Sequence, residues 1–246
     1  MPLPFGDLVK SVGLGMQNKD AELEYWERRF AGYLESGPAL TDGSHDLGHF
    51  QRVWKAARYI NREEGEPADP LILLAAAYFH DLVSLPKNHP QRSESSRVSA
   101  ERAVELLRGP LSVGGPEKSK VFPVEKIEGV RHAIHAHSFS ARVEPLTAEA
   151  RILQDADRLE AVGAIGLARV FYTAGQLGQK LFHPEDPLAE GREPDDRLYS
   201  LDHFKVKLFK LPALMNTATG RRMAESNAVY LEQFLEKIKA EILGMN

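Results

Sequence analysis

The sequence predicts an all-α protein. Apolar residues recur at spacings of three and four along most of the chain, which is the pattern of amphipathic helices. Within residues 20–34, for example, Leu23, Trp26, Phe30 and Leu34 fall on one helix face. No stretch alternates apolar and polar residues for long enough to support a β-sheet. Helices therefore have to supply the whole core.

The elements expected along the chain follow from local signals. Residues 46–63 repeat the amphipathic spacing, and a Gly/Pro-rich break over 65–70 ends that helix. Asp69 is placed to cap the next helix, 71–82, which is apolar on every side and so is expected at the centre of the fold. Further helices are expected over about 93–108, 123–137, 147–174, 199–210 and 217–243, with a polar, Pro-rich loop over 183–197.

Composition narrows the class of protein. The chain has 246 residues, of which 43% are hydrophobic and 27% charged, as is usual for a globular protein. We expect residues 1–19 to be an N-terminal extension and residues 20–246 to be a single helical domain. The net charge of −4 argues against nucleic acid as a partner, and the absence of cysteine excludes disulfides and thiolate chemistry. Without a signal sequence or a long apolar run, no membrane association and a cytoplasmic location are expected.

Two histidines and two aspartates are the most informative residues, because each lies in or beside an apolar helical stretch. They are His49, the adjacent pair His80-Asp81, and Asp157. An unpaired carboxylate is costly to bury without a cation. Two imidazoles and two carboxylates suit manganese, iron, cobalt or zinc better than magnesium or calcium, which prefer oxygen ligands. The set therefore predicts a metal site and hydrolysis by an activated water.

Helical spacing is compatible with this site but does not require it. Arg52 lies one turn after His49, so its guanidinium would sit beside a metal bound there and hold a phosphate oxygen. His80 and Asp81 are about 100° apart on a helix, yet a long imidazole and a short carboxylate can flank one ion. In the alternative interpretation, His80 and Asp81 form a buried hydrogen-bonded pair and Asp157 pairs with a neighbouring arginine.

The order of these residues, H…HD…D, resembles that of the HD-domain superfamily of metal-dependent phosphohydrolases. The surrounding motifs are similar to those of one bacterial branch of small, stand-alone HD hydrolases, over about residues 20–243. The matching segments are Ser-His-Asp-x-x-His-x-x-Arg-Val (44–53), Phe-His-Asp with a following Leu-Pro-Lys (79–87), Ser-Ser-Arg (95–97), His-Ala-Ile-x-Ala-His-Ser-Phe-Ser (132–140), Gln-Asp-Ala-Asp-Arg-Leu-x-Ala (154–161) and Leu-Met-Asn-Thr-x-Thr-Gly-Arg (214–221).

The resemblance implies an all-α HD-domain helical bundle in which His49, His80, Asp81 and Asp157 hold one divalent ion. Manganese is the expected metal, with iron, cobalt, nickel, zinc and magnesium as alternatives. The resemblance also implies a small phosphorylated substrate, and hydrolysis of nucleoside or deoxynucleoside triphosphates to monophosphate and pyrophosphate. A di-iron HD-like oxygenase and a nucleotide-binding sensor without turnover are the alternative functions. The sequence does not indicate an oligomeric state.

A dense histidine cluster, His132, His135 and His137, is expected at the end of a helix. We predict that His132 and His137 face the pocket as catalytic residues beside Asp81, where they would hold water or phosphate, shuttle a proton, or bind a second ion. In the alternative, the cluster only complements the dipole of a helix C-terminus.

Four further residues are predicted to contact the substrate, three of them cations that would neutralise phosphate charge: His45, Arg52, Lys87 and Arg97. Lys87 and Arg97 are also compatible with a solvated loop and an exposed surface. His45 is also compatible with a helix cap, and the pair His45-Asp46 cannot be the ligand doublet because no histidine precedes it in the chain.

Asp155 lies two residues before Asp157 and is expected on a different face of the same helix. We predict that it orients a ligand histidine from the second shell of the site. It is also the substitute ligand if Asp157 does not bind the metal.

Overall fold

The computed structural model describes residues 5–37, 46–83, 91–112, 120–138 and 140–245, and the side chains of these ranges from Asp20 onward. The regular secondary structure of the described residues is helical, and their only β-type pairing is an isolated bridge between Lys180 and Tyr199. The α-helices are α1 (Phe5–Ser36), α2 (Leu47–Glu63), α3 (Pro70–Phe79), α4 (Ser95–Arg108), α5 (Ile127–His137), α6 (Ala148–Leu159), α7 (Gly163–Gln176), α8 (Asp202–Val206) and α9 (Ala218–Ile242). Short 3₁₀ helices add η1 (Arg92–Glu94), η2 (Val124–Lys126), η3 (Leu208–Lys210) and η4 (Pro212–Leu214). The predicted all-α class is confirmed.

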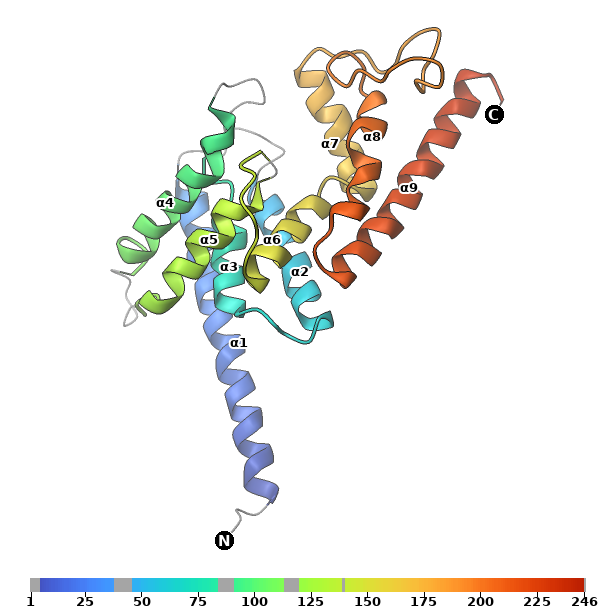
Figure 1. Ribbon diagram of the computed structural model, residues 1–246. Helices are drawn as coiled ribbons and strands as arrows, with labels where there is room; N and C mark the ends of the chain where they lie inside the picture. The colour runs from blue at the N-terminus through green and yellow to red at the C-terminus, as the bar shows by residue number, and fades with distance from the viewer. Residues whose placement is uncertain (1–4, 38–45, 84–90, 113–119, 139, 246) are drawn as a thin grey trace.

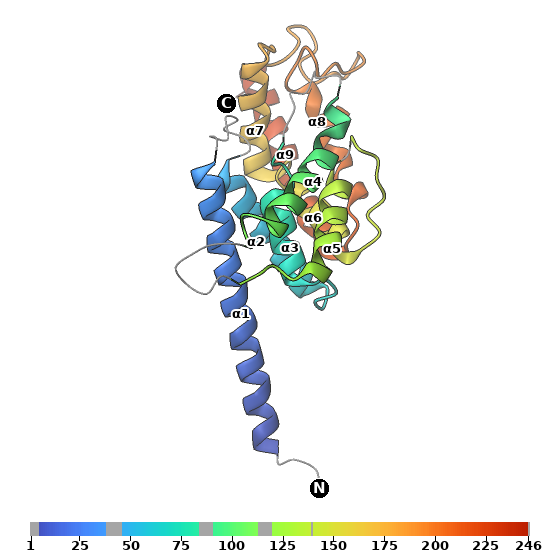
Figure 2. The same cartoon turned by 90° about the vertical axis from the view of Figure 1, so that its left-hand side faces the viewer.

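The helices form two groups (Figure 1). Helices α1 to α6 pack around α3 and are called the core body below. Helices α7 to α9, with η3 and η4, form the C-terminal lobe, and α9 packs against both α7 and α6. The first half of α1 extends away from the core body in both views (Figures 1 and 2).

Helix α3 is the centre of the core body, as its apolar sequence predicts. Its residues from Leu73 to Phe79 are all fully buried, and it packs against α1, α2, α5 and α6. Asp69 caps its N-terminus by accepting hydrogen bonds from Leu71 N (2.9 Å) and Ile72 N (3.2 Å), which confirms the expected cap. The helix ends at Phe79 rather than at residue 82, so that His80 and Asp81 lie just beyond its last turn.

One expected helix, 147–174, is in fact two. Helix α6 ends at Leu159 and α7 begins at Gly163, whose φ of +70° belongs to the left-handed region that interrupts a right-handed helix. Between them, the N–H groups of Glu160, Ala161 and Val162 each bond to the carbonyl three residues earlier, which tightens the chain into a turn. This turn is where the chain passes from the core body to the C-terminal lobe.

The expected helix over 199–210 is shorter than predicted, because it consists of the short α8 followed by η3. The segment 183–197 lacks helix and strand, as expected for a loop, but it is anchored. The buried Asp202 accepts hydrogen bonds from Arg192 Nη1 (2.6 Å) and Nη2 (2.8 Å) and from Asp195 N (2.6 Å).

Within the described ranges, every helix is too short or too polar to cross a bilayer.

Candidate metal centre

Helices α2, α3 and α6 bring the predicted ligands together at one point of the core body. His49 lies in the first turn of α2, where Asp46 caps the helix by accepting a hydrogen bond from His49 N (2.9 Å). His80 follows the last turn of α3, and Asp157 lies in the last turn of α6. Because the ends of three helices meet here, residues 108 positions apart in the sequence come into contact.

The side chains of these residues lie close enough to one another to hold a metal ion. His49 Nε2 and His80 Nε2 are 3.1 Å apart, and Asp157 Oδ1 is 3.8 Å from the former and 3.7 Å from the latter. Asp81 Oδ2 lies 3.9 Å from His80 Nε2. Both histidines are fully buried, and the Asp157 side chain, at 29% exposed, is the more accessible of the two carboxylates. The term ligand cluster denotes His49, His80, Asp81 and Asp157 below.

The outer nitrogens of both imidazoles are anchored by acceptors. His80 Nδ1 lies 2.9 Å from Ala77 O, and His49 Nδ1 lies 3.3 Å from Glu160 Oε2. A carbonyl oxygen only accepts hydrogen bonds, so Nδ1 of His80 carries a proton. These contacts hold both rings with Nε2 facing the cluster. Metal-binding histidines are oriented in this way by acceptors behind them. Two imidazole nitrogens and a carboxylate oxygen that converge on one point fit a divalent cation.

Burial and neighbouring charges shift the pKa values of the cluster residues. Burial opposes ionisation of Asp157, but the adjacent His80 outweighs it and holds the pKa of Asp157 well below its usual range. Burial likewise opposes ionisation of Asp81, yet His137 and His80 hold its pKa below the usual range. Burial lowers the pKa of His49, against the opposing effect of Glu160. Burial opposes ionisation of His80 as well, but Asp157 and Asp81 outweigh it and raise the pKa of His80. The cluster therefore offers two carboxylates that favour a positive charge between them.

His137 lies at the cluster, where the sequence placed it. It is buried, its ring centroid is 4.8 Å from that of His80, and its Nδ1 lies 2.6 Å from Ile134 O. Its Nε2 is 3.5 Å from Asp81 Oδ1. The possible ligand atoms thus form two overlapping groups that share His80: one with His49 and Asp157, the other with Asp81 and His137.

Three predicted site residues are turned to other partners. His132 Nε2 accepts a hydrogen bond from Leu146 N (3.1 Å), so this histidine ties down the loop before α6 instead of facing the pocket. Arg97 is half-exposed and pairs with Glu94 (2.7 Å) at the start of α4. Arg52 directs Nε and Nη2 at Glu160, at 3.0 and 2.8 Å, so its main partner is a carboxylate of this chain rather than a substrate phosphate.

The prediction that Asp155 orients a ligand histidine is wrong. Its buried carboxylate accepts four hydrogen bonds of 2.8 Å, from the backbone and side chain of Asn216 and from the backbone and hydroxyl of Thr217. These donors belong to the start of α9. Asp155 therefore joins α6 to the C-terminal lobe, because a residue two positions before Asp157 points to another side of the helix. His45 and Lys87 lie outside the described residues.

Glu160 and Arg169 are the residues that the sequence prediction missed. Glu160 contacts His49 on the side away from the ligand cluster and also accepts hydrogen bonds from Arg52. Arg169 of α7 lies beside both residues, because its Nη1 is 3.7 Å from Glu160 Oε2 and 3.4 Å from His49 Nδ1. Burial opposes ionisation of Glu160, but its contacts with His49 and Arg52 outweigh that and lower its pKa. The spacing Asp157 to Glu160 is one helical turn, which was a usable signal. The sequence held no signal for Arg169, because it lies in the next helix, whose position relative to α6 the sequence does not specify.

The sequence and the fold of this chain are similar to those of known proteins. An HD domain matches residues 46–162, which include the whole ligand cluster. The uncharacterized protein YpgQ of Bacillus subtilis (strain 168) is 34% identical over 213 residues, which are 84% of this chain and 90% of that protein. The crystal structure of B. subtilis YpgQ in complex with ADP has a TM-score of 0.65 and 30% identity, and the match covers 91% of this chain and 98% of that one.

A crystal structure of an HD-superfamily hydrolase from Bacillus thuringiensis gives a TM-score of 0.63 and 30% identity, over 91% of this chain and 97% of that one. The fold and the converging histidines and aspartates define the class as metal-dependent phosphohydrolases. The chain belongs to the HD-domain family of such enzymes.

Proposed function

We propose that this enzyme hydrolyses nucleoside or deoxynucleoside triphosphates to the monophosphate and pyrophosphate, with one divalent ion, preferably manganese, held by His49, His80, Asp81 and Asp157. The observation that carries the proposal is the pair of inward-facing Nε2 atoms, 3.1 Å apart, beside Asp157. The relative YpgQ has been crystallised with ADP, which supports a nucleotide as the ligand here. A donor set of imidazoles and carboxylates favours manganese over magnesium.

The residues of the chain have distinct parts in this reaction. When bound, the ion supplies Lewis acidity at a phosphoryl oxygen and an activated water. Glu160 keeps the proton of His49 on Nδ1, so that Nε2 stays available as a ligand atom. His137 Nε2 is placed beside Asp81 to hold a proton during the reaction. Because its Nδ1 is anchored on Ile134 O, the ring is fixed in that orientation.

Product analysis tests the proposal directly. The purified protein is incubated with a mixed panel of nucleoside and deoxynucleoside triphosphates and Mn²⁺, and products are separated by anion-exchange chromatography. We expect monophosphate and pyrophosphate in a 1:1 ratio, and no reaction with excess EDTA. Unchanged nucleotides would overturn the proposed substrate class, and oxygen uptake with an iron-loaded protein would favour the oxygenase alternative.

His137 and His132 provide a matched pair of variants for the same assay. Both are histidines of α5, but only His137 lies at the ligand cluster. His137→Ala should lower kcat by about 10²-fold or more, as is typical for a positioned proton-transfer group. His132→Ala should keep most of the activity. Equal losses of activity in both variants would show that His137 has no specific part in the reaction.

A further inference from the structure

A cavity in the C-terminal lobe is separate from the ligand cluster. It has a volume of about 210 Å³ and lies between the loop over 183–197, the segment 201–209, which contains α8, and the second half of α9. At about 30 Å³ per water molecule, this is the space of about seven waters, which suits a small organic molecule. The described residues that line it all come from these three segments, and the ligand cluster contributes none.

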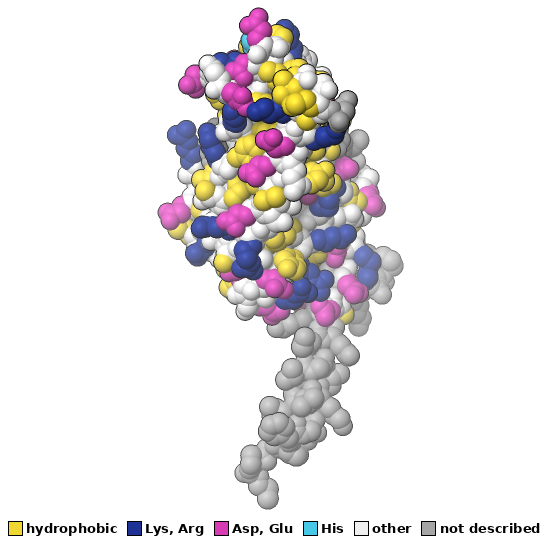
Figure 3. All heavy atoms as spheres, turned by 90° about the vertical axis from the view of Figure 1, so that its right-hand side faces the viewer, with side chains coloured by type: hydrophobic (Ala, Val, Ile, Leu, Met, Phe, Trp, Pro, Cys, Tyr) yellow, Lys and Arg dark blue, Asp and Glu magenta, His cyan; other side chains and the backbone are white. Residues whose placement is uncertain are grey.

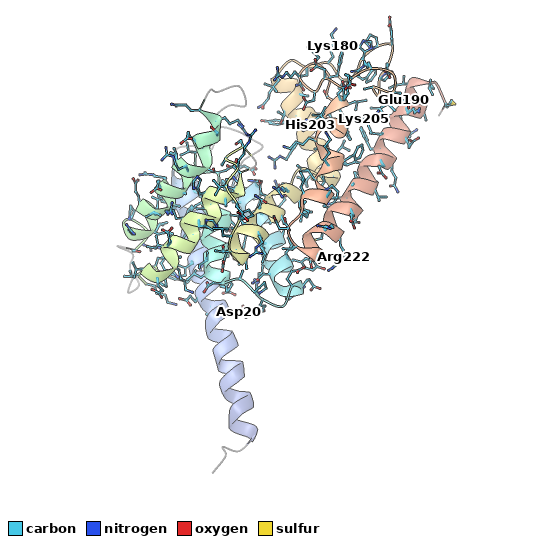
Figure 4. The ribbon with its side chains drawn as sticks, viewed as in Figure 1. Asp20, Lys180, Glu190, His203, Lys205 and Arg222 are labelled. Carbon is cyan, nitrogen blue, oxygen red and sulfur yellow. The ribbon has the colours of Figure 1, made fainter. Side chains whose placement is uncertain are left out.

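Hydrogen bonds from several sides hold the loop that forms one wall of this cavity. Asp186 accepts a hydrogen bond from Glu190 N (2.8 Å) within the loop. Lys205 Nζ of α8 donates to Ala189 O (3.0 Å), and Lys239 Nζ of α9 donates to Glu190 Oε1 (2.7 Å). Figure 4 labels Glu190 and Lys205 near the C-terminal end of α9. Because the wall is attached to both α8 and α9, the cavity is preformed.

The interior of the cavity is apolar. Leu201 is buried, and Leu188, Phe209 and Leu235 are partly buried and pack against the hydrophobic core. All four side chains line the cavity. Apolar surface in contact with water is unfavourable, so a ligand with an apolar body that covers these side chains is favoured.

The charged side chains that line the cavity have both signs. Glu232 and Glu236 are exposed and lie one turn apart, so they present two carboxylates on one side of α9. Lys205 brings an ammonium group from α8, whereas Glu190 is already paired with Lys239. On the side of the molecule along α9, acidic, basic and apolar side chains are interspersed (Figure 3). The cavity therefore combines an apolar interior with carboxylates from α9 and an ammonium group from α8.

We propose that this cavity binds a small zwitterion with an apolar body, namely an apolar α-amino acid. Its side chain covers the apolar interior, its ammonium group binds the carboxylates of Glu232 and Glu236, and its carboxylate binds Lys205. An ammonium group has three donors, so the bond from Lys205 to Ala189 O leaves donors for the ligand. A purely cationic ligand would be repelled by Lys205, and a purely anionic one by the two glutamates. The inference does not depend on the proposed function.

Calorimetric titration of the full-length, metal-loaded protein with L-leucine, L-methionine and L-phenylalanine tests the site. At least one of them should bind, and the amine and the carboxylic acid analogues of the tightest one, each of which lacks one charge, should bind about tenfold more weakly. The affinity should be the same with excess EDTA, because the ligand cluster does not line the cavity. Binding that disappears with EDTA would place the amino acid on the metal instead and refute the site.

Variants assign each charge of the ligand to its partner. The double variant Glu232→Gln, Glu236→Gln and the single variant Lys205→Met should each lose about tenfold in affinity for the amino acid. The double variant should bind the carboxylic acid analogue no more weakly than the wild type does, and Lys205→Met should do the same for the amine. Lys205→Arg keeps the charge and should retain most of the affinity. Glu225→Gln removes an exposed charge of α9 that does not line the cavity and should leave binding unchanged.

Three results would refute the proposal. In the first, the wild type binds none of the three amino acids. In the second, the amino acid and its two singly charged analogues bind equally well, which would mean that only apolar contacts matter. In the third, the double variant and Lys205→Met bind the amino acid as tightly as Glu225→Gln does. Circular dichroism and thermal melting of the variants show whether a loss of binding is a folding defect, and Lys205→Arg tests the charge with the loop contact preserved.

Discussion

The two sides of α6 carry aspartates that differ in role although they are two residues apart. Asp155 is fully buried and its carboxylate accepts four hydrogen bonds from Asn216 and Thr217. Asp157 is partly exposed, and its Oδ1 lies 3.8 Å and 3.7 Å from the Nε2 atoms of His49 and His80. A carboxylate saturated with donors stabilises the fold, whereas one that faces other ligand atoms is available for a cation.

Glycine at position 220 reinforces the structural role of Asp155. A Cβ at Gly220 would lie 2.5 Å from Asp155 Oδ2 and 2.8 Å from Thr217 Oγ1. The start of α9 can therefore approach α6 this closely only without a side chain at that position. The side of α6 that carries Asp155 packs tightly against the start of α9 and is called the packed side below. The side that carries Asp157 faces α2 and α3 and is called the reactive side.

The largest expected effect is on the reactive side. Asp157→Ala should lower activity by about 10³-fold, since metal catalysis supplies several kcal/mol and each 1.4 kcal/mol is a factor of ten. The bound metal, measured by mass spectrometry after gel filtration, should fall in parallel. A variant that keeps its metal and its activity would show that Asp157 is not a ligand.

A substitution on the packed side of α6 should lower the stability of the protein. Asp155→Ala leaves the donors of Asn216 and Thr217 without their acceptor and should lower the free energy of unfolding by about 3 kcal/mol. Urea unfolding with EDTA present measures this without a contribution from bound metal. Asp157→Ala should change the stability much less under the same conditions. If the two variants lose stability equally, the distinction between the two sides of α6 fails.

An intermediate effect is expected at Glu160, which lies at the end of α6 on the reactive side. Glu160→Gln keeps the shape but loses the charge that orients His49 and receives Arg52. Metal affinity should fall about 10- to 100-fold, as is typical when an outer partner of a ligand histidine is removed. Titration with a chelator competitor measures the affinity, and far-UV circular dichroism should be unchanged. An unaltered metal affinity would show that Glu160 only pairs with Arg52 and Arg169 and does not orient His49.

The smallest effect is expected at a second contact between the core body and α9. Thr219 donates its backbone N–H to Glu64 Oε1 (2.6 Å), and its hydrogen bonds lower the pKa of Glu64 from the ordinary 4.5. The unfolded state then binds more protons, so this contribution is present above about pH 4.5 and is lost as the pH falls through the lower folded pKa. Because the site is solvated, we expect less than about 1 kcal/mol.

Glu64→Gln tests that sign. Its difference in unfolding free energy from the wild type should be largest near pH 7 and should shrink below pH 4.5, when measured with urea across that range. A difference that grows on acidification would contradict the assignment.

Much of the site was predictable from sequence because local signals specify local structure. The spacing of Leu23, Trp26 and Phe30 predicted a helix, and Asp69 predicted a cap, both of which the structure has. The sequence predicted His49, His80, Asp81 and Asp157 as one ligand set; the structure brings His49, His80 and Asp157 together and places Asp81 with His80 and His137. The division into an extension over 1–19 and a single domain over 20–246 stays a prediction.

Side-chain direction was where sequence reasoning failed. His132 and His137 occupy one short helix, but 140° of helical rotation beyond one full turn separates them, and only His137 points at the ligand cluster. Arg52 was correctly placed one turn from His49, yet its partner Glu160 comes from α6. Pattern alone cannot show which charged group from another helix will reach a cation first.

The sequence by itself determined most of the helices and the apolar centre at α3, because propensity, capping and hydrophobic spacing act within a few residues. The tertiary structure decided which aspartate of α6 faces the histidines, which histidine of α5 joins them, and that Arg169 of the C-terminal lobe contacts His49. These contacts join residues far apart in the chain. Only the packing of the helices against one another sets their geometry.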